Sequence, residues 1–266
     1  MDIFSDLGKK TYIMGVLNVT PDSFSDGGDF IDSKKALRHA KEMEEEGADI
    51  IDIGGESTRP GSVEIDVKEE MRRIHPPLKV LVKEIKKPIS VDTYKASVAK
   101  EVLDMGASII NDVWGMQKDP DMARVASEYD VPVVLMHNKK KAYYEGDIIE
   151  EIKDFLKKSI DIAKEGGISE DKIIVDPGIG FGKEHEHSVE VMKRLDELKE
   201  LGYPVLLGTS RKRMIGNILD LPPKERVEGT VATTVAGIFK GVDVVRVHDV
   251  KENYRAARVI DCIYRE

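Results

Sequence analysis

Cysteine is nearly absent from this sequence, which has one, Cys262, among 266 residues. A single thiol allows no disulfide within the chain, so the core alone must hold the fold together. No apolar run approaches the roughly 20 residues that cross a bilayer, and the first residues lack the basic and apolar parts of a secretory signal. We therefore expect a cytoplasmic protein with no membrane contact.

An excess of positive charge is also missing. The 41 Lys and Arg residues are outnumbered by 50 Asp and Glu residues, and the net charge is −9. Acidic and basic residues alternate within the charged runs, as in 193–200, which is typical of solvent-exposed helix faces. Binding to a nucleic-acid backbone favours the opposite balance, so the composition predicts no nucleic-acid partner.

Short apolar runs alternate with amphipathic stretches along the whole chain. The runs predict strands at 12–19, 49–55, 88–92, 108–113, 131–136, 172–176, 204–209 and 242–248. The amphipathic stretches predict helices near 33–46, 64–86, 95–105, 119–129, 148–165, 186–201, 224–240 and 251–264. Eight such pairs without a linker predict an α/β fold, with residues 1–266 forming a single (β/α)8 TIM barrel. An open, doubly wound sheet is the alternative, and eight units make it the poorer match.

Polar residues collect where the predicted strands end, which is the face on which barrel enzymes build their sites. Asp92, Asn111 and Asp176 follow different strands, and their acceptors and amide suit a flat heterocycle with several N–H donors. Lys212 adds a donor for a ring oxygen or nitrogen. The same ends carry cations suited to a phosphate or pyrophosphate, namely Arg59, Arg211, Arg246 and His248. This convergence predicts an enzyme.

Other motifs point less clearly to chemistry. Residues 178–183 are rich in glycine but lack the spacing of a P-loop, and His185-Glu186-His187 is not the His-Glu-x-x-His pattern of zinc enzymes. Lys212 after a strand would also suit a Schiff base, as in barrel aldolases. The segment 18–28, rich in Asp, Ser and Gly, predicts a mobile cover over the site.

Two long motifs carry a family resemblance. Residues 18–28, Asn-Val-Thr-Pro-Asp-Ser-Phe-Ser-Asp-Gly-Gly, and 52–61, Asp-Ile-Gly-Gly-Glu-Ser-Thr-Arg-Pro-Gly, resemble the two signature loops of dihydropteroate synthases. The match continues through 90–93, 110–113, 176–181, 208–212 and 246–249, and so covers nearly the whole chain.

The resemblance implies a pterin-binding barrel with long mobile loops after strands 1 and 2. It implies a transferase of folate biosynthesis that joins 7,8-dihydropterin-6-ylmethyl diphosphate to p-aminobenzoate with Mg²⁺, acts as a homodimer and is a sulfonamide target. The pterin would be held by Asp92, Asn111, Met136, Asp176, Phe181 and Lys212. The diphosphate would be held by Asn18, Thr58, Arg59, Arg246 and His248, with Asn18 also placing the metal ion. Phe24, Pro60, Lys212 and Arg213 would shape the p-aminobenzoate pocket.

One position departs from the family pattern. Serine often follows the Ser-Arg-Lys triplet and contacts the acceptor carboxylate, whereas this chain has Arg213. Arginine would still meet a carboxylate, or would suit a larger or more anionic arylamine. Three other readings remain: a methyltetrahydrofolate:corrinoid methyltransferase, a non-catalytic pterin-binding protein and a phosphate-binding barrel aldolase.

Overall fold

A parallel β-sheet forms the centre of the molecule in the computed structural model, which describes residues 3–19, 28–57 and 63–265. Within these residues the strands are β1 (Tyr12–Asn18), β2 (Ile50–Gly54), β3 (Ile89–Asp92), β4 (Ile109–Asp112), β5 (Val133–Met136), β6 (Ile173–Asp176), β7 (Leu206–Leu207) and β8 (Val244–Val247). Their order is β6-β5-β4-β3-β2-β1-β8-β7. A parallel bridge between Val175 and Val205 joins the two ends of that order. The sheet is therefore a barrel, and the open-sheet alternative is wrong.

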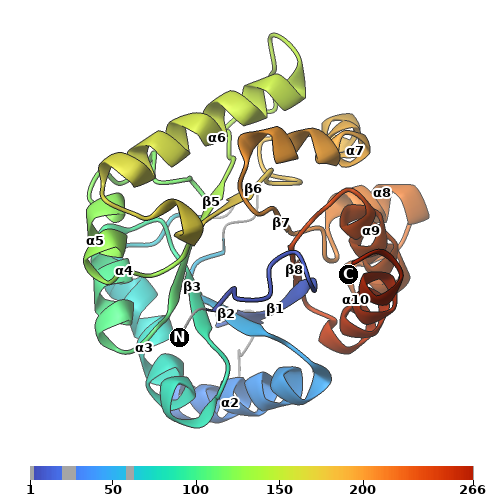
Figure 1. The fold of residues 1–266 in the computed structure, drawn as a ribbon. Coiled ribbons are helices and arrows are strands. Elements are labelled where there is room, and N and C mark those ends of the chain that lie inside the picture. The colour runs from blue at the N-terminus through green and yellow to red at the C-terminus, as the bar shows by residue number, and fades with distance from the viewer. Residues whose placement is uncertain (1–2, 20–27, 58–62, 266) are drawn as a thin grey trace.

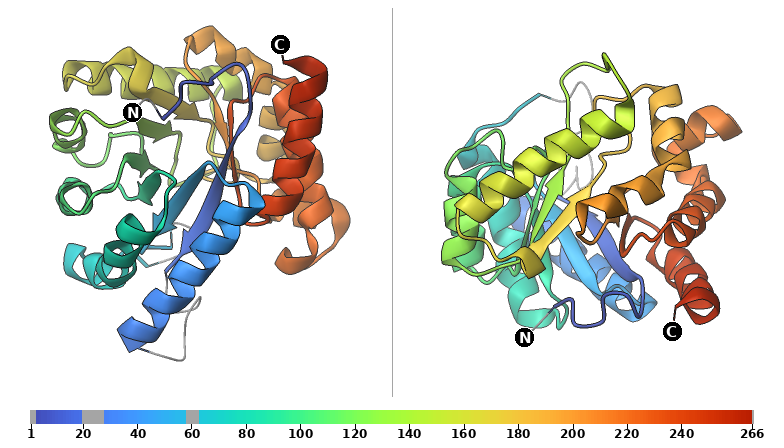
Figure 2. Two further views of the ribbon diagram at one scale, coloured as in Figure 1. Left: turned by 60° about the horizontal axis from the view of Figure 1, so that its bottom comes forward. Right: turned by 45° about the horizontal axis from the view of Figure 1, so that its top comes forward.

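Helices surround the strands as an outer ring (Figures 1 and 2). They are α2 (Gly28–Glu46), α3 (Val67–Glu84), α4 (Ala96–Asp104), α5 (Met122–Glu128), α6 (Ile148–Glu165), α7 (His185–Lys193), α8 (Arg213–Leu219), α9 (Val227–Phe239) and α10 (Val250–Tyr264). Short 3-10 helices are η1 (Glu170–Lys172), η2 (Leu195–Leu201) and η3 (Pro223–Glu225). None of these described helices combines the length and apolar character that crossing a membrane requires.

The predicted alternation of strands and helices is confirmed, with two differences in detail. The helix expected at 186–201 is two elements, because the backbone leaves the helical region at Arg194 (φ −114°, ψ 21°). The seven-residue helix α8 was not predicted, since so short a segment shows no clear period. The loops predicted after strands 1 and 2 include residues 20–27 and 58–62, which lie outside the described residues.

Apolar side chains fill the barrel interior at the end where the strands begin. This inner cluster consists of Phe4, Tyr12, Met14, Ile50, Ile109, Val134, Ile174, Leu206 and Val244, most of them at or near the first residue of a strand. Phe4 precedes β1 and packs its ring 5.2 Å from that of Tyr12. Because this end of the barrel is filled with apolar residues, polar groups inside the barrel are confined to its other half.

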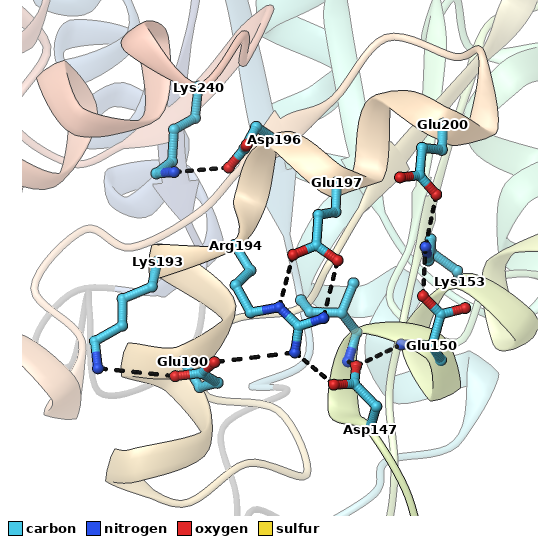
Figure 3. Close-up of polar contacts among 11 residues, drawn as sticks. Asp147, Glu150, Lys153, Glu190, Lys193, Arg194, Asp196, Glu197, Glu200 and Lys240 are labelled. Atoms are coloured by element: carbon cyan, nitrogen blue, oxygen red, sulfur yellow. Dashed lines mark hydrogen bonds and ion pairs between the residues drawn. The ribbon is translucent and has the colours of Figure 1, made fainter.

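Ion pairs join the outer ends of α6, α7 and η2 (Figure 3). The Arg194 guanidinium binds the carboxylates of Asp147 and Glu197, the latter through two nitrogens at 2.7 and 2.9 Å. Lys153 lies between Glu150 (2.6 Å) and Glu200 (2.8 Å). The carboxylates of these pairs are partly or largely exposed, and pairs open to solvent contribute about 0 to 1 kcal/mol each, so this network orients neighbouring helices without dominating stability.

Candidate active site

The strand ends bring most of the predicted site residues to one rim of the barrel. Asn18, Asp92, Met136 and Asp176 are the last residues of β1, β3, β5 and β6. Parallel pairing places Asn111 of β4 opposite Asp92, and Asp176 opposite Met136. The neighbouring strands β3 to β6 thus deliver two carboxylates, an amide and an apolar side chain to adjacent positions, and β1 adds the amide of Asn18.

Arg246 of β8 is held across the barrel by two carboxylates. Its Nε donates to Asp52 Oδ2 at 2.6 Å, and its Nη2 donates to Asp92 Oδ2 at 3.0 Å. Asp52 is completely buried, and the side-chain amide of Asn111 also donates to its Oδ2, at 3.4 Å. The guanidinium therefore lies beneath the rim and links β8 to β2 and β3.

Asp52 is a site residue that the sequence analysis missed, because only strand ends were considered. It lies inside β2, and its register partner is Ser90, two residues before Asp92. The available signal was a carboxylate within the apolar run Ile50-Ile51-Asp52-Ile53. A buried charge of that kind needs a partner, and the partner here is Arg246.

Three buried oxygens of this region have no hydrogen-bond partner among the described residues: Asp52 Oδ1, Ser90 Oγ and Asp92 Oδ1. Burial raises the pKa of Asp92 to about 7, with Arg246 opposing the shift and Asp52 adding to it. Burial also raises the pKa of Asp176, against the opposing charge of Lys212. Unsatisfied buried acceptors are costly and rare, so these oxygens fit a role in accepting hydrogen bonds from a bound molecule.

Lys212 is the residue immediately before α8, and its side chain extends into the site. Its Nζ donates to the carbonyl oxygen of Ile179 at 2.6 Å and lies 4.7 Å from the centre of the Phe181 ring. Part of the residue is open to solvent, but the ammonium is deeply placed, and burial lowers its pKa to about 8 while Asp176 opposes that shift. The lysine therefore faces both a carboxylate and an aromatic ring.

An apolar wall adjoins these charged groups. Tyr94, Val113 and Met136 form a small buried cluster, and Trp114 and Phe181 pack against it. The resemblance implied that Met136 and Phe181 help to hold the pterin, and the structure brings them into one cluster beside Lys212. A planar ring with N–H groups at its edge would find apolar contact on this wall and could donate hydrogen bonds to the neighbouring carboxylates.

The other predicted residues that the structure describes lie around the same rim. His248 follows β8, and both its backbone nitrogen and its Nδ1 are 3.0 Å from Ser210 Oγ. Arg213 is exposed at the first residue of α8. The guanidinium of Arg211 pairs with Asp249, which also follows β8. Phe24, Thr58, Arg59 and Pro60 lie outside the described residues.

The described part of the chain offers few protein ligands for a metal ion. Among the described residues no group of three or more His, Cys, Asp or Glu side chains is placed to hold one. Asn18 offers a half-buried amide oxygen at the end of β1. Mg²⁺ commonly keeps several waters and takes most of its other ligands from substrate phosphates, so this donor set fits a magnesium ion that arrives with a phosphorylated substrate.

Comparison with known proteins agrees with this geometry. The family model for pterin binding enzymes matches residues 14–248. The dihydropteroate synthase of Clostridium beijerinckii is 55% identical over 98% of this chain and 97% of its own length. The chain belongs to the dihydropteroate synthase family. The recognition made from the two loop motifs is thereby confirmed.

Solved structures of dihydropteroate synthases extend the agreement to the fold. The enzyme from Clostridium difficile, crystallised in the presence of pteroic acid, has a TM-score of 0.96 and 59% identity, covering 98% of this chain and 99% of its own. The enzyme from Xanthomonas albilineans with 4-aminobenzoic acid has a TM-score of 0.92 and 41% identity, covering 96% of this chain and 94% of its own. The (β/α)8 barrel is therefore the fold of this dihydropteroate synthase family member.

Proposed function

We propose that this chain condenses 7,8-dihydropterin-6-ylmethyl diphosphate with p-aminobenzoate, giving 7,8-dihydropteroate and pyrophosphate. The observation that carries the proposal is 55% identity to a dihydropteroate synthase across almost the entire length of both chains. The site supports it independently, because its acceptors, cations and apolar wall suit the two ends of that diphosphate substrate.

The pterin ring binds where the unsatisfied acceptors meet the apolar wall. Asp92 and Asp176 accept hydrogen bonds from ring N–H groups, and Asn111 offers both a donor and an acceptor. Met136 and Phe181 contact the ring faces, and Lys212 donates to a ring oxygen or nitrogen. The two aspartates act by hydrogen bonding and charge stabilisation, not as nucleophiles. The electron-rich pterin stabilises the cation that remains when the diphosphate departs, so no covalent intermediate with the protein is needed.

Departure of the diphosphate is assisted by positive charge at the rim. Arg246 and His248 bind its oxygens, together with Thr58 and Arg59 of the second loop. Asn18 would hold Mg²⁺ against the same group, and a bound Mg²⁺ supplies Lewis-acid stabilisation of the leaving oxygens. As the C–O bond breaks, the electron pair leaves with pyrophosphate and the ring delocalises the positive charge of the methylene carbon.

The arylamine then attacks that carbon. Its nitrogen is neutral near pH 7 and carries its own lone pair, so it needs no strong base, and it loses one proton once the C–N bond has formed. Phe24, Pro60, Lys212 and Arg213 shape its pocket. The exposed guanidinium of Arg213 at the start of α8 suits the carboxylate of p-aminobenzoate.

Dimer formation is also part of the proposal. Large apolar side chains are exposed on α8, α9 and α10: Ile218, Leu219, Phe239, Val259, Ile263 and Tyr264. The rings of Phe239 and Tyr264 meet edge to face at 4.3 Å. An exposed apolar surface of this kind marks a protein interface, and a second copy of the chain is the partner that the family resemblance implies.

The cytoplasmic location and the single domain over 1–266 stay predictions.

Pyrophosphate release tests the reaction. Purified protein is incubated with the dihydropterin diphosphate and Mg²⁺, with and without p-aminobenzoate, and the product is identified by mass. Release that depends on the arylamine and yields dihydropteroate supports the proposal. Pterin binding without that product would refute it and favour the methyltransferase or binding-protein alternative, while borohydride trapping at Lys212 would favour the aldolase.

A further inference from the structure

A second lysine lies buried behind the site, with no role in the chemistry described above. Lys183 is 8% exposed, and its Nζ donates to the carbonyl oxygens of Gly178 at 3.0 Å and Phe181 at 3.1 Å. The same Nζ is 2.7 Å from His137 Nδ1. Lys183 Nζ thus has three hydrogen-bond partners, and the contacts join the loop after β6 to the end of β5.

The loop 177–183 is held between two lysines. The carbonyl oxygens of Gly178 and Phe181 bind Lys183, whereas that of Ile179, between them, accepts from Lys212 in the site at 2.6 Å. Carbonyls of one short loop therefore accept hydrogen bonds both from a buried lysine and from a lysine of the site. The conformation of this loop sets the position of the Phe181 ring and of the carbonyl that orients Lys212.

Burying the Lys183 ammonium costs free energy, so the lysine is poorly explained as a device that only stabilises the fold. Burial lowers the pKa of Lys183 well below its ordinary value, although the Asp176 carboxylate opposes that shift. Burial of His137, with Lys183 beside it, lowers the pKa of that imidazole in turn. An apolar side chain of similar length would fill the same space without this desolvation, so the lysine is better explained by the carbonyls it fixes.

The backbone conformation of the 177–183 loop is also restricted by its glycines and its hydrogen bonds. Gly178 has a φ of +66°, and a Cβ there would lie 2.0 Å from the carbonyl oxygen of His137. Its backbone N–H donates to Asp176 Oδ1 at 2.7 Å, so the loop and the site carboxylate are oriented together. On the far side the Tyr144 hydroxyl donates to the Gly182 carbonyl at 2.9 Å.

We infer that Lys183 is a positioning residue for the pterin half of the site: its hydrogen bonds to Gly178 and Phe181 hold the 177–183 loop so that Phe181, Asp176 and Lys212 meet the pterin ring together. This inference rests on the proposed function for its substrate. It assigns Lys183 no contact with the acceptor or the diphosphate.

The test replaces Lys183 by methionine, which keeps the length of the side chain and removes its donors. Lys183→Met should raise the KM for dihydropterin diphosphate about tenfold or more, because Phe181 and Lys212 lose their fixed orientation. The KM for p-aminobenzoate should rise by a clearly smaller factor, because Phe181 and Asp176 serve the pterin alone, whereas Lys212 is shared with the arylamine pocket. A lysine that served stability alone would lower the melting temperature without separating the two KM values.

The chain offers a matched control in Lys153 of α6, whose side chain is 6% exposed and pairs with Glu150 and Glu200 on the outer surface (Figure 3). Lys153→Met also removes a largely covered lysine and should leave both KM values unchanged. If Lys183→Met raises the pterin KM no more than Lys153→Met does, the inference is wrong even though dihydropteroate is still made.

Two further measurements keep the inference testable. If Lys183→Met does not fold, Tyr144→Phe removes one hydroxyl from the same loop and should raise the pterin KM about threefold, and an unchanged KM would overturn the inference. If the unaltered protein makes no dihydropteroate, the proposed function fails separately. Calorimetric affinity for 7,8-dihydropterin then replaces KM, and equal affinity in the Lys183→Met and unaltered proteins would refute the positioning role.

Discussion

Asp52 gives the sharpest test of the site electrostatics, because it is fully buried and shares one guanidinium with Asp92. Replacing it by asparagine keeps the shape of the side chain and removes its charge. Two changes should then lower the pKa of Asp92: a like charge disappears, and Arg246 is left with a single carboxylate. The pKa of Asp92, raised to about 7 in the unaltered protein, should therefore fall.

The size of the shift follows from the geometry. Two carboxylates bound to one guanidinium are about 5 Å apart, so at an effective dielectric constant of about 20 they repel by about 3 kcal/mol, or about two pKa units. The guanidinium between them screens part of this repulsion, so a downward shift of about one unit is expected. The free energy of unfolding of Asp52→Asn should also fall by about 2 to 3 kcal/mol. This is less than the usual cost of breaking a buried ion pair, because Arg246 still pairs with Asp92.

The assay is the pH dependence of kcat/KM for the dihydropterin diphosphate. In the proposed site Asp92 accepts ring N–H hydrogen bonds much more strongly when it is ionised, so kcat/KM should decline as the pH falls through about 7 in the unaltered protein. In Asp52→Asn the decline should begin about one unit lower. Asp261→Asn is the control, because Asp261 is also buried but binds Thr11 near the start of β1, so this variant should lose stability and keep the original profile.

If the low-pH decline in kcat/KM of Asp52→Asn stays at the pH of the unaltered protein, or moves to higher pH, this account of the site is refuted. The first result would mean that Asp92 does not titrate in this range or that its ionisation does not limit binding. An upward shift would mean that Asp52 holds Arg246 in a position from which it stabilises the ionised form of Asp92.

Three further results are expected. Burial lowers the pKa of Lys212 to about 8, so kcat/KM should decline as the pH rises above about 8, and Lys212→Gln should lose this basic limb together with about 100-fold in kcat/KM. Removal of Mg²⁺ by a chelator should stop pyrophosphate release, and Asn18→Ala should weaken the Mg²⁺ dependence of pyrophosphate binding measured by calorimetry. Phe239→Asp, which places a charge beside Tyr264 on the exposed apolar surface, should halve the sedimenting mass if that surface forms a dimer.

Sequence periodicity was sufficient for the barrel because each strand is a short buried run, such as Ile173–Asp176, between amphipathic segments. The site residues at strand ends, including Asp92 and Asp176, were accessible for the same reason. Asp52 required knowledge of register, since its role depends on Arg246, which is 194 positions away in the chain. The role of Lys183 could not be predicted from the sequence for a different reason. Its partners include backbone carbonyls, and their directions depend on the positive φ of Gly178.

The two ends of the barrel interior are built for opposite purposes. At the start of the strands, apolar side chains such as Met14 and Ile50 are completely buried and stabilise the fold by the transfer of apolar area from water. At the other end, Asp52 and Asp92 are also buried and Arg246 is half-buried, and apolar residues of equal volume in place of such a group are often neutral or stabilising. Charge is therefore retained there at a cost in stability, and that cost is consistent with groups that become fully hydrogen-bonded only when a pterin diphosphate is present.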